Sequence, residues 1–318
     1  MRTILVTGGA GFIGSHLTAR LLERGLHVVC LDDFNDYYDP AFKRANVATF
    51  ASGANWTLVE GDIRDAALVD GTFRRHGVSA VIHLAARAGV RPSIRQPRLY
   101  EEVNGIGTLN LLEAAHRWGA YSFIFGSSSS VYGANSKVPF SEEDPVTNPL
   151  SPYAATKRAN ELMCWTYHHL YGLKVTGLRF FTVYGPCQRP EMAIYHFTER
   201  LAQGQAVPRF GDGSTARDYT YIDDIVAGVL AAFDADSEFE IVNLGGSRTT
   251  TLQRLIELIA GELGVPPKVE ELPDQPGDVP LTYADVSKAE RLWGWRPQVP
   301  IEEGIARFVR WFKAERLR

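Results

Sequence analysis

The sequence has little cysteine, no long apolar run and no strong net charge. Only three cysteines occur in 318 residues, Cys30, Cys164 and Cys187, and none belongs to a CxxC or Cys/His pattern. Such a chain offers no disulfide framework and no zinc site, so no metal is expected and a reducing cytoplasm fits best. No hydrophobic run approaches the length that spans a bilayer, and the first residues lack the pattern of a signal peptide. We therefore expect a cytoplasmic protein without a membrane partner.

The charge balance excludes a further class of partner. The formal net charge is −4, so no basic surface suited to nucleic acid is expected. A composition of 45% hydrophobic and 22% charged residues is typical of a globular enzyme. A chain of 318 residues is long enough for one large or two modest domains around a sizeable core.

Short β-branched runs alternate with longer amphipathic segments through the first half of the chain. This alternation is the pattern of βαβ units, which build a parallel sheet. Strands are expected at 3–7, 27–32, 56–60, 80–83, 122–126, 175–179 and 239–244. Helices are expected at 12–24, 66–75, 103–120 and 153–171, and a last amphipathic helix near the end of the chain.

The second half of the chain is more broken, because Pro and Gly interrupt 184–190, 204–214 and 266–280. We expect an α/β fold, a doubly wound parallel Rossmann sheet with a smaller interleaved substrate-binding lobe. The nucleotide-binding domain is expected at 1–181 plus about 224–246, and the lobe at about 182–223 plus 247–318. Ligand should bind in the crevice at the carboxyl ends of the strands.

A glycine-rich turn follows the first predicted strand directly. Gly8, Gly11 and Gly14 have the spacing GxxGxxG, with Phe12 and Ile13 inside it, and they open the first predicted helix. Small residues are needed here because a tight turn must bring backbone N–H groups and the helix N-terminus against a pyrophosphate. A glycine-rich turn alone is equally well explained as a structural turn, so its context decides.

The end of the second predicted strand supplies that context. Asp32 stands where an acid accepts hydrogen bonds from the adenosine ribose of a dinucleotide, and its charge repels a 2′-phosphate. Asp33 follows it, and no Arg or Lys occurs until Lys43. The sequence therefore favours NAD over NADP.

Two further strand ends carry candidate cofactor contacts. Asp62 and Ile63, just past the third strand, are placed to meet the adenine, although Asp62 could instead cap the following helix. Leu84, Ala85 and Ala86 follow the fourth strand, and their small apolar side chains suit close passage of a cofactor. Tight packing explains those three residues equally well.

Tyr153 and Lys157 are four residues apart and therefore share one face of a predicted helix. A nearby Lys⁺, together with the positive nicotinamide of NAD⁺, would lower the pKa of a tyrosine from its usual value near 10. Tyr153 could then accept a proton from a substrate hydroxyl as hydride leaves. The alternative is an ordinary surface pair. Ser128, at the end of the fifth strand, is the candidate third member, although a serine run also suits a plain loop.

The segments GGAGFIG, HLAA, SSSSVYG, SPYAATK, LRFFTVYGP and RDYTYIDDI together resemble the nucleotide-sugar epimerase branch of the extended short-chain dehydrogenases/reductases. The resemblance covers essentially the whole chain and is closest to the UDP-glucuronate 4-epimerases. It implies an isomerase with a Ser–Tyr–Lys triad at Ser128, Tyr153 and Lys157, and a tightly held NAD. Hydride leaves C4 of a UDP-sugar, the 4-keto sugar turns over, and hydride returns to its other face. The resemblance also implies a homodimer formed through helices 103–120 and 153–171.

The same resemblance implies further ligand contacts. Asn104 matches a family position near the active site, and Phe181 one beside the nicotinamide. Thr182 stands where galactose 4-epimerases typically carry Asn, which favours the glucuronate form. Arg189 could pair with the C6 carboxylate or with the diphosphate, and otherwise would be a surface cation.

Ser129 and Ser130 could donate hydrogen bonds to that carboxylate. The resemblance assigns Arg217 to the diphosphate, Arg209 to a nucleotide-binding loop and Asp278 to the ribose.

Rival activities remain open on this fold. A UDP-glucose/UDP-galactose or N-acetyl-sugar 4-epimerase would share the triad, and so would a UDP-glucuronate decarboxylase. In 4,6-dehydratases an Asp-Glu pair stands where this chain has Ser129 and Ser130, which argues against dehydration. A non-catalytic NAD-binding protein commonly lacks the Tyr or the Lys, and this chain has both.

Overall fold

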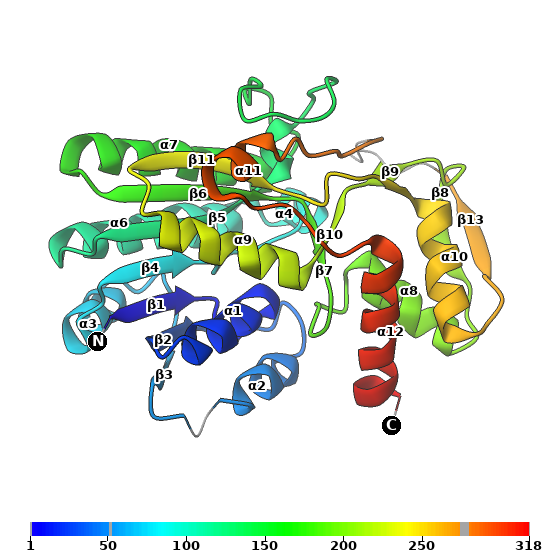
Figure 1. The fold of residues 1–318 in the computed structure, drawn as a ribbon, viewed down its shortest axis with the longest axis horizontal. Coiled ribbons are helices and arrows are strands. Elements are labelled where there is room, and N and C mark those ends of the chain that lie inside the picture. The colour runs from blue at the N-terminus through cyan, green and yellow to red at the C-terminus, as the bar shows by residue number, and fades with distance from the viewer. Residues whose placement is uncertain (1, 51–52, 274–279, 318) are drawn as a thin grey trace.

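The computed structural model describes residues 2–50, 53–273 and 280–317, and its centre is a seven-stranded parallel sheet (Figure 1). The strand order is β11-β6-β5-β4-β1-β2-β3. The strands are β1 (Thr3–Thr7), β2 (His27–Asp32), β3 (Trp56–Glu60), β4 (Ala80–His83), β5 (Ser122–Ser128), β6 (Lys174–Phe180) and β11 (Phe239–Leu244). The order reverses direction beside β1, so the carboxyl ends of β1 and β4 flank a crevice.

Helices cover both faces of this sheet (Figure 1). One layer contains α3 (Ala66–His76), α6 (Gly107–Arg117) and α7 (Pro152–Tyr171), and the other contains α1 (Phe12–Glu23) and α9 (Ile222–Ala235). Shorter helices are α2 (Pro40–Ala48), α4 (Val90–Arg95) and α5 (Pro97–Tyr100). A sheet with helices on both faces is the doubly wound arrangement that the alternating sequence predicts.

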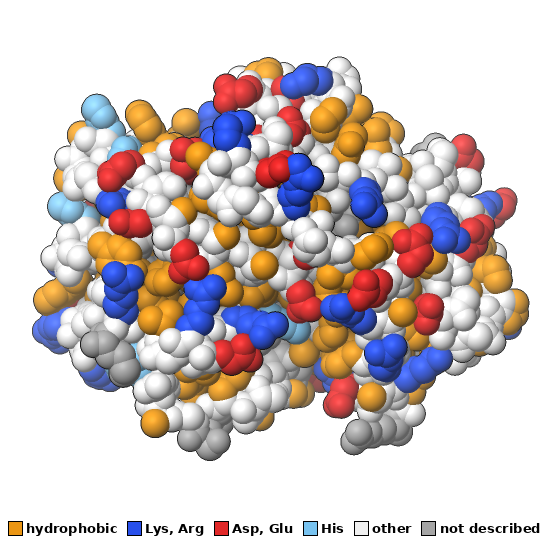
Figure 2. Space-filling view, in the orientation of Figure 1, with side chains coloured by type: hydrophobic (Ala, Val, Ile, Leu, Met, Phe, Trp, Pro, Cys, Tyr) orange, Lys and Arg blue, Asp and Glu red, His pale blue; other side chains and the backbone are white. Residues whose placement is uncertain are grey.

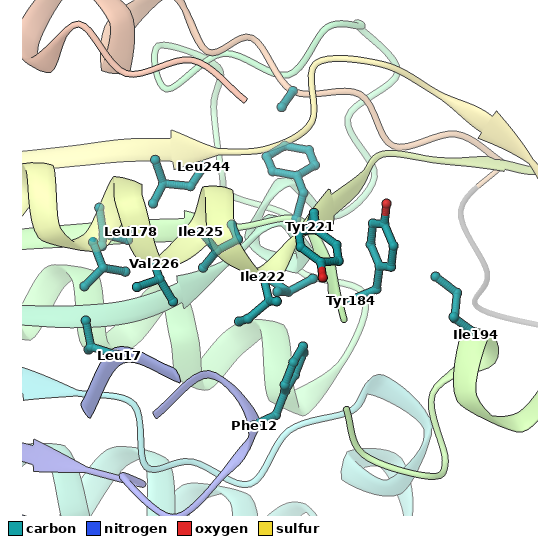
Figure 3. Packing of buried hydrophobic residues seen from close by; sticks show 14 of the residues in the cluster. Phe12, Leu17, Leu178, Tyr184, Ile194, Tyr221, Ile222, Ile225, Val226 and Leu244 are labelled. Carbon is teal, nitrogen blue, oxygen red and sulfur yellow. The ribbon is translucent and has the colours of Figure 1, made fainter. Parts of the chain in front are cut away.

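Alternation along the buried strands explains why two cores form. Ile4 and Val6 pack toward α1 and α9, whereas Leu5 packs toward α3 and α6, and all three are fully buried. Successive strand side chains point to opposite faces, so one apolar run supplies both cores. Figure 3 shows the first core, where Leu17 of α1 and Val226 of α9 meet Leu178 of β6.

Smaller elements beside the carboxyl ends of the strands form the second part of the molecule (Figure 1). Three two-stranded sheets pair β7 (Thr182–Tyr184) with β10 (Tyr219–Tyr221), β9 (Ala216–Arg217) with β12 (Thr250–Thr251), and β8 (Val207–Phe210) with β13 (Val269–Leu272). The helices are α8 (Ala193–Ala202), α10 (Leu252–Leu263), α11 (Ser287–Trp293) and α12 (Ile301–Arg316). α11 packs on α9 and β11 of the large sheet, so the division into two lobes stays a prediction.

Two elements differ from the sequence expectation, both beside the crevice. β5 continues to Ser128 because Ser127 and Ser128 pair with β6, so half of the serine run is strand and only Ser129–Tyr132 forms a 3₁₀ turn. The helix expected from residue 103 begins as a π-helix, Glu101–Ile106, and becomes α6 at Gly107. Thr108 and Asn160 donate hydrogen bonds to the backbone carbonyl of Asn104 within that wider turn.

The outer surface carries both signs of charge. On the face in Figure 2, basic and acidic side chains are interspersed, in keeping with the small net charge. Within the described ranges, no helix has both the length and the apolar character required to cross a membrane.

Candidate active site

A cavity of about 440 Å³ opens at the carboxyl ends of the parallel strands. The predicted site residues that line it are Gly8, Gly11, Phe12, Ile13, Gly14, Asp32, Asp62, Ile63, Leu84, Ala85, Ala86, Ser128, Ser129, Ser130, Tyr153, Lys157, Phe181, Thr182 and Arg189. They come from seven separate chain segments, and the parallel sheet brings them to one edge.

The glycine turn has the close approaches that a dinucleotide site requires. Gly8 has φ +67°, and a Cβ there would lie 2.7 Å from the backbone nitrogen of Ala85. A Cβ on Gly14 would collide with the carbonyl oxygen of Gly8. α1 begins at Gly11 without a side-chain cap, so its first N–H groups remain available at the cavity wall. This turn fits a diphosphate held against a helix N-terminus.

Asp32 is 5% exposed and is held from three sides. Its carboxylate accepts hydrogen bonds from the backbone nitrogens of Ala10 (3.2 Å) and Phe34 (3.0 Å), and from Lys43 Nζ (3.1 Å). Along the chain Lys43 is 11 residues from Asp32, so the sequence predicts no cation beside this carboxylate. That prediction is wrong, because α2 folds back and buries Lys43 beside Asp32 in the cavity. The remaining lone pair of the carboxylate is still free for a ribose hydroxyl.

Asp62 does not cap the following helix. Asp65 is the N-cap of α3 and accepts a hydrogen bond from the backbone nitrogen of Leu68. Asp62 instead lines the cavity and pairs with Arg64, and although burial raises its pKa, the Arg64 hydrogen bonds leave that pKa below its usual value. The alternative explanation of Asp62 as a helix cap is therefore wrong.

Tyr153 is on the first turn of α7 and faces Ser128 at the end of β5. Burial raises the pKa of Tyr153, while a hydrogen-bonding interaction with Ser128 and the positive charge of Arg189 lower it. The ring of Tyr100 packs edge-on against Tyr153 at 6.2 Å between centroids. Protein burial alone thus opposes phenolate formation, and nearby positive charge must overcome it.

Lys157 is 4% exposed, and its Nζ donates a 2.7 Å hydrogen bond to the carbonyl oxygen of Gly126. Burial lowers the pKa of Lys157 to about 8, against the charge of Glu161. Burial also lowers the pKa of neighbouring His83 to about 3, so His83 is neutral between Thr7 and Thr108. Lys157 is therefore the titratable cation at this end of the cavity.

Asn104 does not line the cavity, although the resemblance implies a site near it. Its side-chain oxygen accepts from the backbone nitrogen of Arg87 (2.8 Å), and its amide donates to the carbonyl of Arg87 (3.0 Å) and to Thr156 Oγ1 (3.1 Å). Asn104 thus connects the segment after β4 to α7, and a contact between Asn104 and the cofactor stays a prediction.

Arg189 lies at the end of the cavity nearest Tyr153, with its side chain 22% exposed. It forms a 3.2 Å ion pair with Glu191, and its guanidinium lies over the ring of Tyr37. The alternative of a cation on the open surface is wrong.

Sequence reasoning missed several residues that line the cavity. They are Asn35, Tyr37, Tyr38, Lys43, Arg87 and Met192. Tyr37 donates a 2.8 Å hydrogen bond to the carbonyl of Ala88, and Arg87 also lies near its ring. The only sequence signal for them was the aromatic pair directly after the acidic end of β2.

Arg209 and Arg217 lie outside the cavity lining, on the two-stranded sheets β8–β13 and β9–β12. Arg209 on β8 donates to Gln253 and pairs with Glu271, and Arg217 on β9 donates to the carbonyl of Ala216. Asp278 falls outside the described residues. Nucleotide contacts from these three positions stay predictions.

A partly exposed Tyr and a buried Lys, one helical turn apart, meet the end of β5 beside a dinucleotide turn. This arrangement is that of the nicotinamide-dependent short-chain dehydrogenases/reductases. The family model described as GDP-mannose 4,6 dehydratase matches residues 5–308, and the chain belongs to this family of extended short-chain dehydrogenases/reductases. The predicted family and the predicted fold class are both confirmed.

Within this family, the chain is similar to several UDP-sugar 4-epimerases. A UDP-glucuronate 4-epimerase of Thermodesulfobacterium geofontis is 43% identical over 310 residues, covering 97% of this chain and 95% of the relative. The crystal structure of UDP-glucuronic acid 4-epimerase from Bacillus cereus, with UDP-glucuronic acid and NAD, has a TM-score of 0.92 and 34% identity, covering 98% of this chain and 99% of that one. UDP-glucose 4-epimerase from Thermotoga maritima, solved with UDP-glucose, has a TM-score of 0.91 and 37% identity over 98% and 99% of the two chains.

Proposed function

We propose that this protein is an NAD-dependent 4-epimerase that interconverts UDP-glucuronate and UDP-galacturonate. The substrate assignment rests on the position of Arg189. Arg189 lines the same cavity as Tyr153, and its positive charge lowers the pKa of Tyr153. A guanidinium beside the proton acceptor suits a sugar whose carboxylate is adjacent to the reacting carbinol. Relatives of this chain that act on UDP-glucuronate, and one solved with that sugar and NAD, support the same assignment.

The residues divide the chemistry among themselves. NAD, when bound, supplies the acceptor and donor of hydride. Tyr153 takes the proton of the C4 hydroxyl and returns it, and Ser128 donates a hydrogen bond to the same oxygen. Burial opposes phenolate formation at Tyr153, and the charge of Arg189 acts against that burial. The ammonium of Lys157, one helical turn along α7, adds positive charge on the same side of the helix in this mechanism. Ser129, Ser130 and Arg189 hold the carboxylate while the 4-keto sugar turns over.

Two rival reactions, dehydration and decarboxylation, fit the cavity less well. A 4,6-dehydratase requires an acid and a base directly after the serine of its catalytic triad. In this chain Ser129 and Ser130, on the 3₁₀ turn, occupy those two positions. Decarboxylation competes because the 4-keto form of glucuronate is a β-keto acid. Strong hydrogen bonds to the carboxylate disfavour that loss, since carbon dioxide leaves most easily from a weakly solvated group. UDP-glucose is the second candidate substrate, favoured by the likeness to the Thermotoga maritima enzyme.

Separate incubations with UDP-glucuronate, UDP-glucose and UDP-N-acetylglucosamine test the proposal, with products resolved by chromatography. We expect UDP-galacturonate as the main product of the first and slow or no conversion of the others. Faster turnover of UDP-glucose would contradict the substrate assignment. Absence of turnover with every UDP-sugar would contradict the activity.

A homodimer in the cytoplasm is part of the proposal. Large apolar side chains are exposed on α7, with Leu162 at 53%, Trp165 at 49% and Leu170 at 60%. A second copy of the chain would cover this surface. Light scattering should give twice the chain mass for the wild type, and Trp165→Glu should shift it toward the monomer. A wild type that is already monomeric contradicts the dimer.

A further inference from the structure

A buried carboxylate lies one helical turn beyond the catalytic lysine. Glu161 is 2% exposed and follows Lys157 by four residues on α7. Its Oε1 accepts hydrogen bonds from Ser127 Oγ (2.7 Å) and Arg179 Nε (2.9 Å). Its Oε2 accepts from Arg179 Nη2 (2.9 Å) and Arg158 Nη1 (2.9 Å). All four contacts are side-chain contacts, and they come from two strands and from α7 itself.

The pair of Glu161 with Arg179 is unlike a surface ion pair. Both residues are 2% exposed, and the guanidinium binds the carboxylate through two parallel hydrogen bonds. Although burial alone raises the pKa of Glu161, the Arg179 contacts outweigh it, and the net pKa is lowered. Arg179 also donates to the hydroxyl of Tyr132 (3.1 Å), which donates to Asn243 (2.7 Å). Burying these charges carries a desolvation penalty that their mutual attraction often only balances. Stability alone therefore does not account for a charged network at this position beside the site.

One contact of Glu161, and one hydrogen bond of Lys157 on the same strand, connect this network to the reacting groups. Ser127 precedes Ser128, so the bond to Glu161 fixes the end of β5 where the catalytic hydroxyl lies. Lys157 donates to the carbonyl of Gly126, one residue earlier on the same strand. The end of β5 is therefore attached to α7 at two successive residues, through Lys157 at Gly126 and through Glu161 at Ser127.

We propose that Glu161 is a positioning residue for the Ser128, Tyr153 and Lys157 set, which holds the end of β5 through Ser127 and places a carboxylate one helical turn from Lys157 on α7. This role rests on the proposed function, because it concerns proton transfer at Tyr153. Neither the family comparison nor the Tyr-Lys spacing assigns a role to this carboxylate.

The charges around Lys157 support that role. His83 on β4 is neutral, and Cys164 on α7 has its pKa raised by burial, so it remains a thiol. Arg158 on α7 and Arg179 on β6 are positive, and both pair with Glu161. Glu161 is the carboxylate whose charge raises the pKa of Lys157 against burial. Without Glu161, Lys157 would lose its proton at a lower pH, and Arg179 would add to that effect.

The test compares the pH dependence of kcat for the NAD-loaded wild type and Glu161→Gln. Gln keeps the size and loses the charge, so we expect the alkaline limb to move to lower pH by about one unit, with KM nearly unchanged. Glu113→Gln is the matched control, since it makes the same change against α7 at Tyr167. We expect the control to keep the wild-type limb.

A second variant guards against misfolding, because Glu161→Gln leaves Arg179 buried and partly unpaired. Glu161→Leu combined with Arg179→Met replaces the pair by apolar side chains and is expected to fold. It should show a limb shifted in the same direction. An unshifted limb in a folded, NAD-loaded variant overturns the proposal, and so does failure of both variants to fold, which would show a role in the fold alone. The wild type is assayed first, because lack of turnover there defeats the proposed function instead.

Discussion

The guanidinium of Arg189 lies over the ring of Tyr37, with 5.7 Å between its central carbon and the ring centroid. Tyr37 is itself fixed, because its hydroxyl donates to the carbonyl of Ala88. A glycine at 89 is required for that contact, since a Cβ there would lie 2.8 Å from the Tyr37 hydroxyl. The segment after β2 therefore holds a cation from a distant loop at the cavity wall, where Glu191 is its present partner. We expect a substrate carboxylate to replace Glu191 at Arg189.

Replacing Arg189 should separate charged from neutral sugars. Arg189→Ala should weaken UDP-glucuronate binding by roughly 1.5–3 kcal/mol, the range for a hydrogen bond to a charged group, and affect UDP-glucose much less. It should also release a small amount of UDP-4-keto-pentose, because the carboxylate is less firmly held. Calorimetry and product chromatography measure both effects. Equal losses for the two sugars would show that Arg189 serves the diphosphate or the fold.

Removal of the Tyr153 hydroxyl should stop turnover while leaving the cofactor bound. The ring of Tyr153→Phe keeps its packing against Tyr100 but lacks the proton acceptor, so we expect a loss of about 10²–10⁴-fold in kcat. Ser128→Ala should cost less, because water can partly replace its hydrogen bond. Initial rates and the nicotinamide content of the purified proteins provide the measurement. Near-full activity in Tyr153→Phe would refute the mechanism.

Asp32 should control the choice between NAD and NADP, with Lys43 as its buried partner. Asp32→Ala removes the ribose contact and leaves the Lys43 ammonium, 8% exposed, facing the cavity. We expect preference to move toward NADP by roughly tenfold or more, since a charged hydrogen bond contributes about 1.5–3 kcal/mol. Adding Lys43→Met should remove most of that gain. Titrations of both variants with NAD and NADP measure this preference. A wild type that prefers NADP would show that the assignment of NAD as cofactor is wrong.

Asp218 should stabilise the segment that follows β11 and the segment around Ala284. Its carboxylate is fully buried and accepts hydrogen bonds from the backbone nitrogens of Gly246, Ser247 and Ala284. Asp218→Asn turns one acceptor into a donor facing N–H groups, at a cost of about 1–3 kcal/mol. Thermal unfolding should show a Tm lower by several degrees.

The deficit of Asp218→Asn should depend on pH. Burial raises the pKa of Asp218 from 3.8 to about 7, so the folded protein binds the proton more tightly than the unfolded chain. The contribution of the carboxyl to stability is therefore full below pH 3.8 and falls as pH rises toward 7. Because Asn does not titrate, the Tm gap should narrow over that window. A gap that widens with pH would contradict the raised pKa.

The sequence by itself determined the parts of this protein that depend on local periodicity. Alternating apolar runs gave the parallel strands within two residues at each end, and the glycine turn after β1 located the dinucleotide end of the cavity. The spacing of Tyr153 and Lys157 required one face of a helix, because four residues make about one turn. These features follow from local side-chain periodicity and turn chemistry, and so do the bounds of α1, α3 and α7, which the sequence placed within a residue at each end.

The tertiary structure decided everything that depends on which strands are neighbours. Lys43 reaches Asp32 only because α2 folds back over β2, and Arg179 reaches Glu161 only because β6 pairs with β5 beside α7. Asn104 lies in a π-helix, and its amide donates hydrogen bonds to the carbonyl of Arg87 and to Thr156, residues far from it in the chain. Partners so far apart in the chain leave no periodic signal, since their contact is set by sheet order and helix packing, and both arise only when the whole core closes.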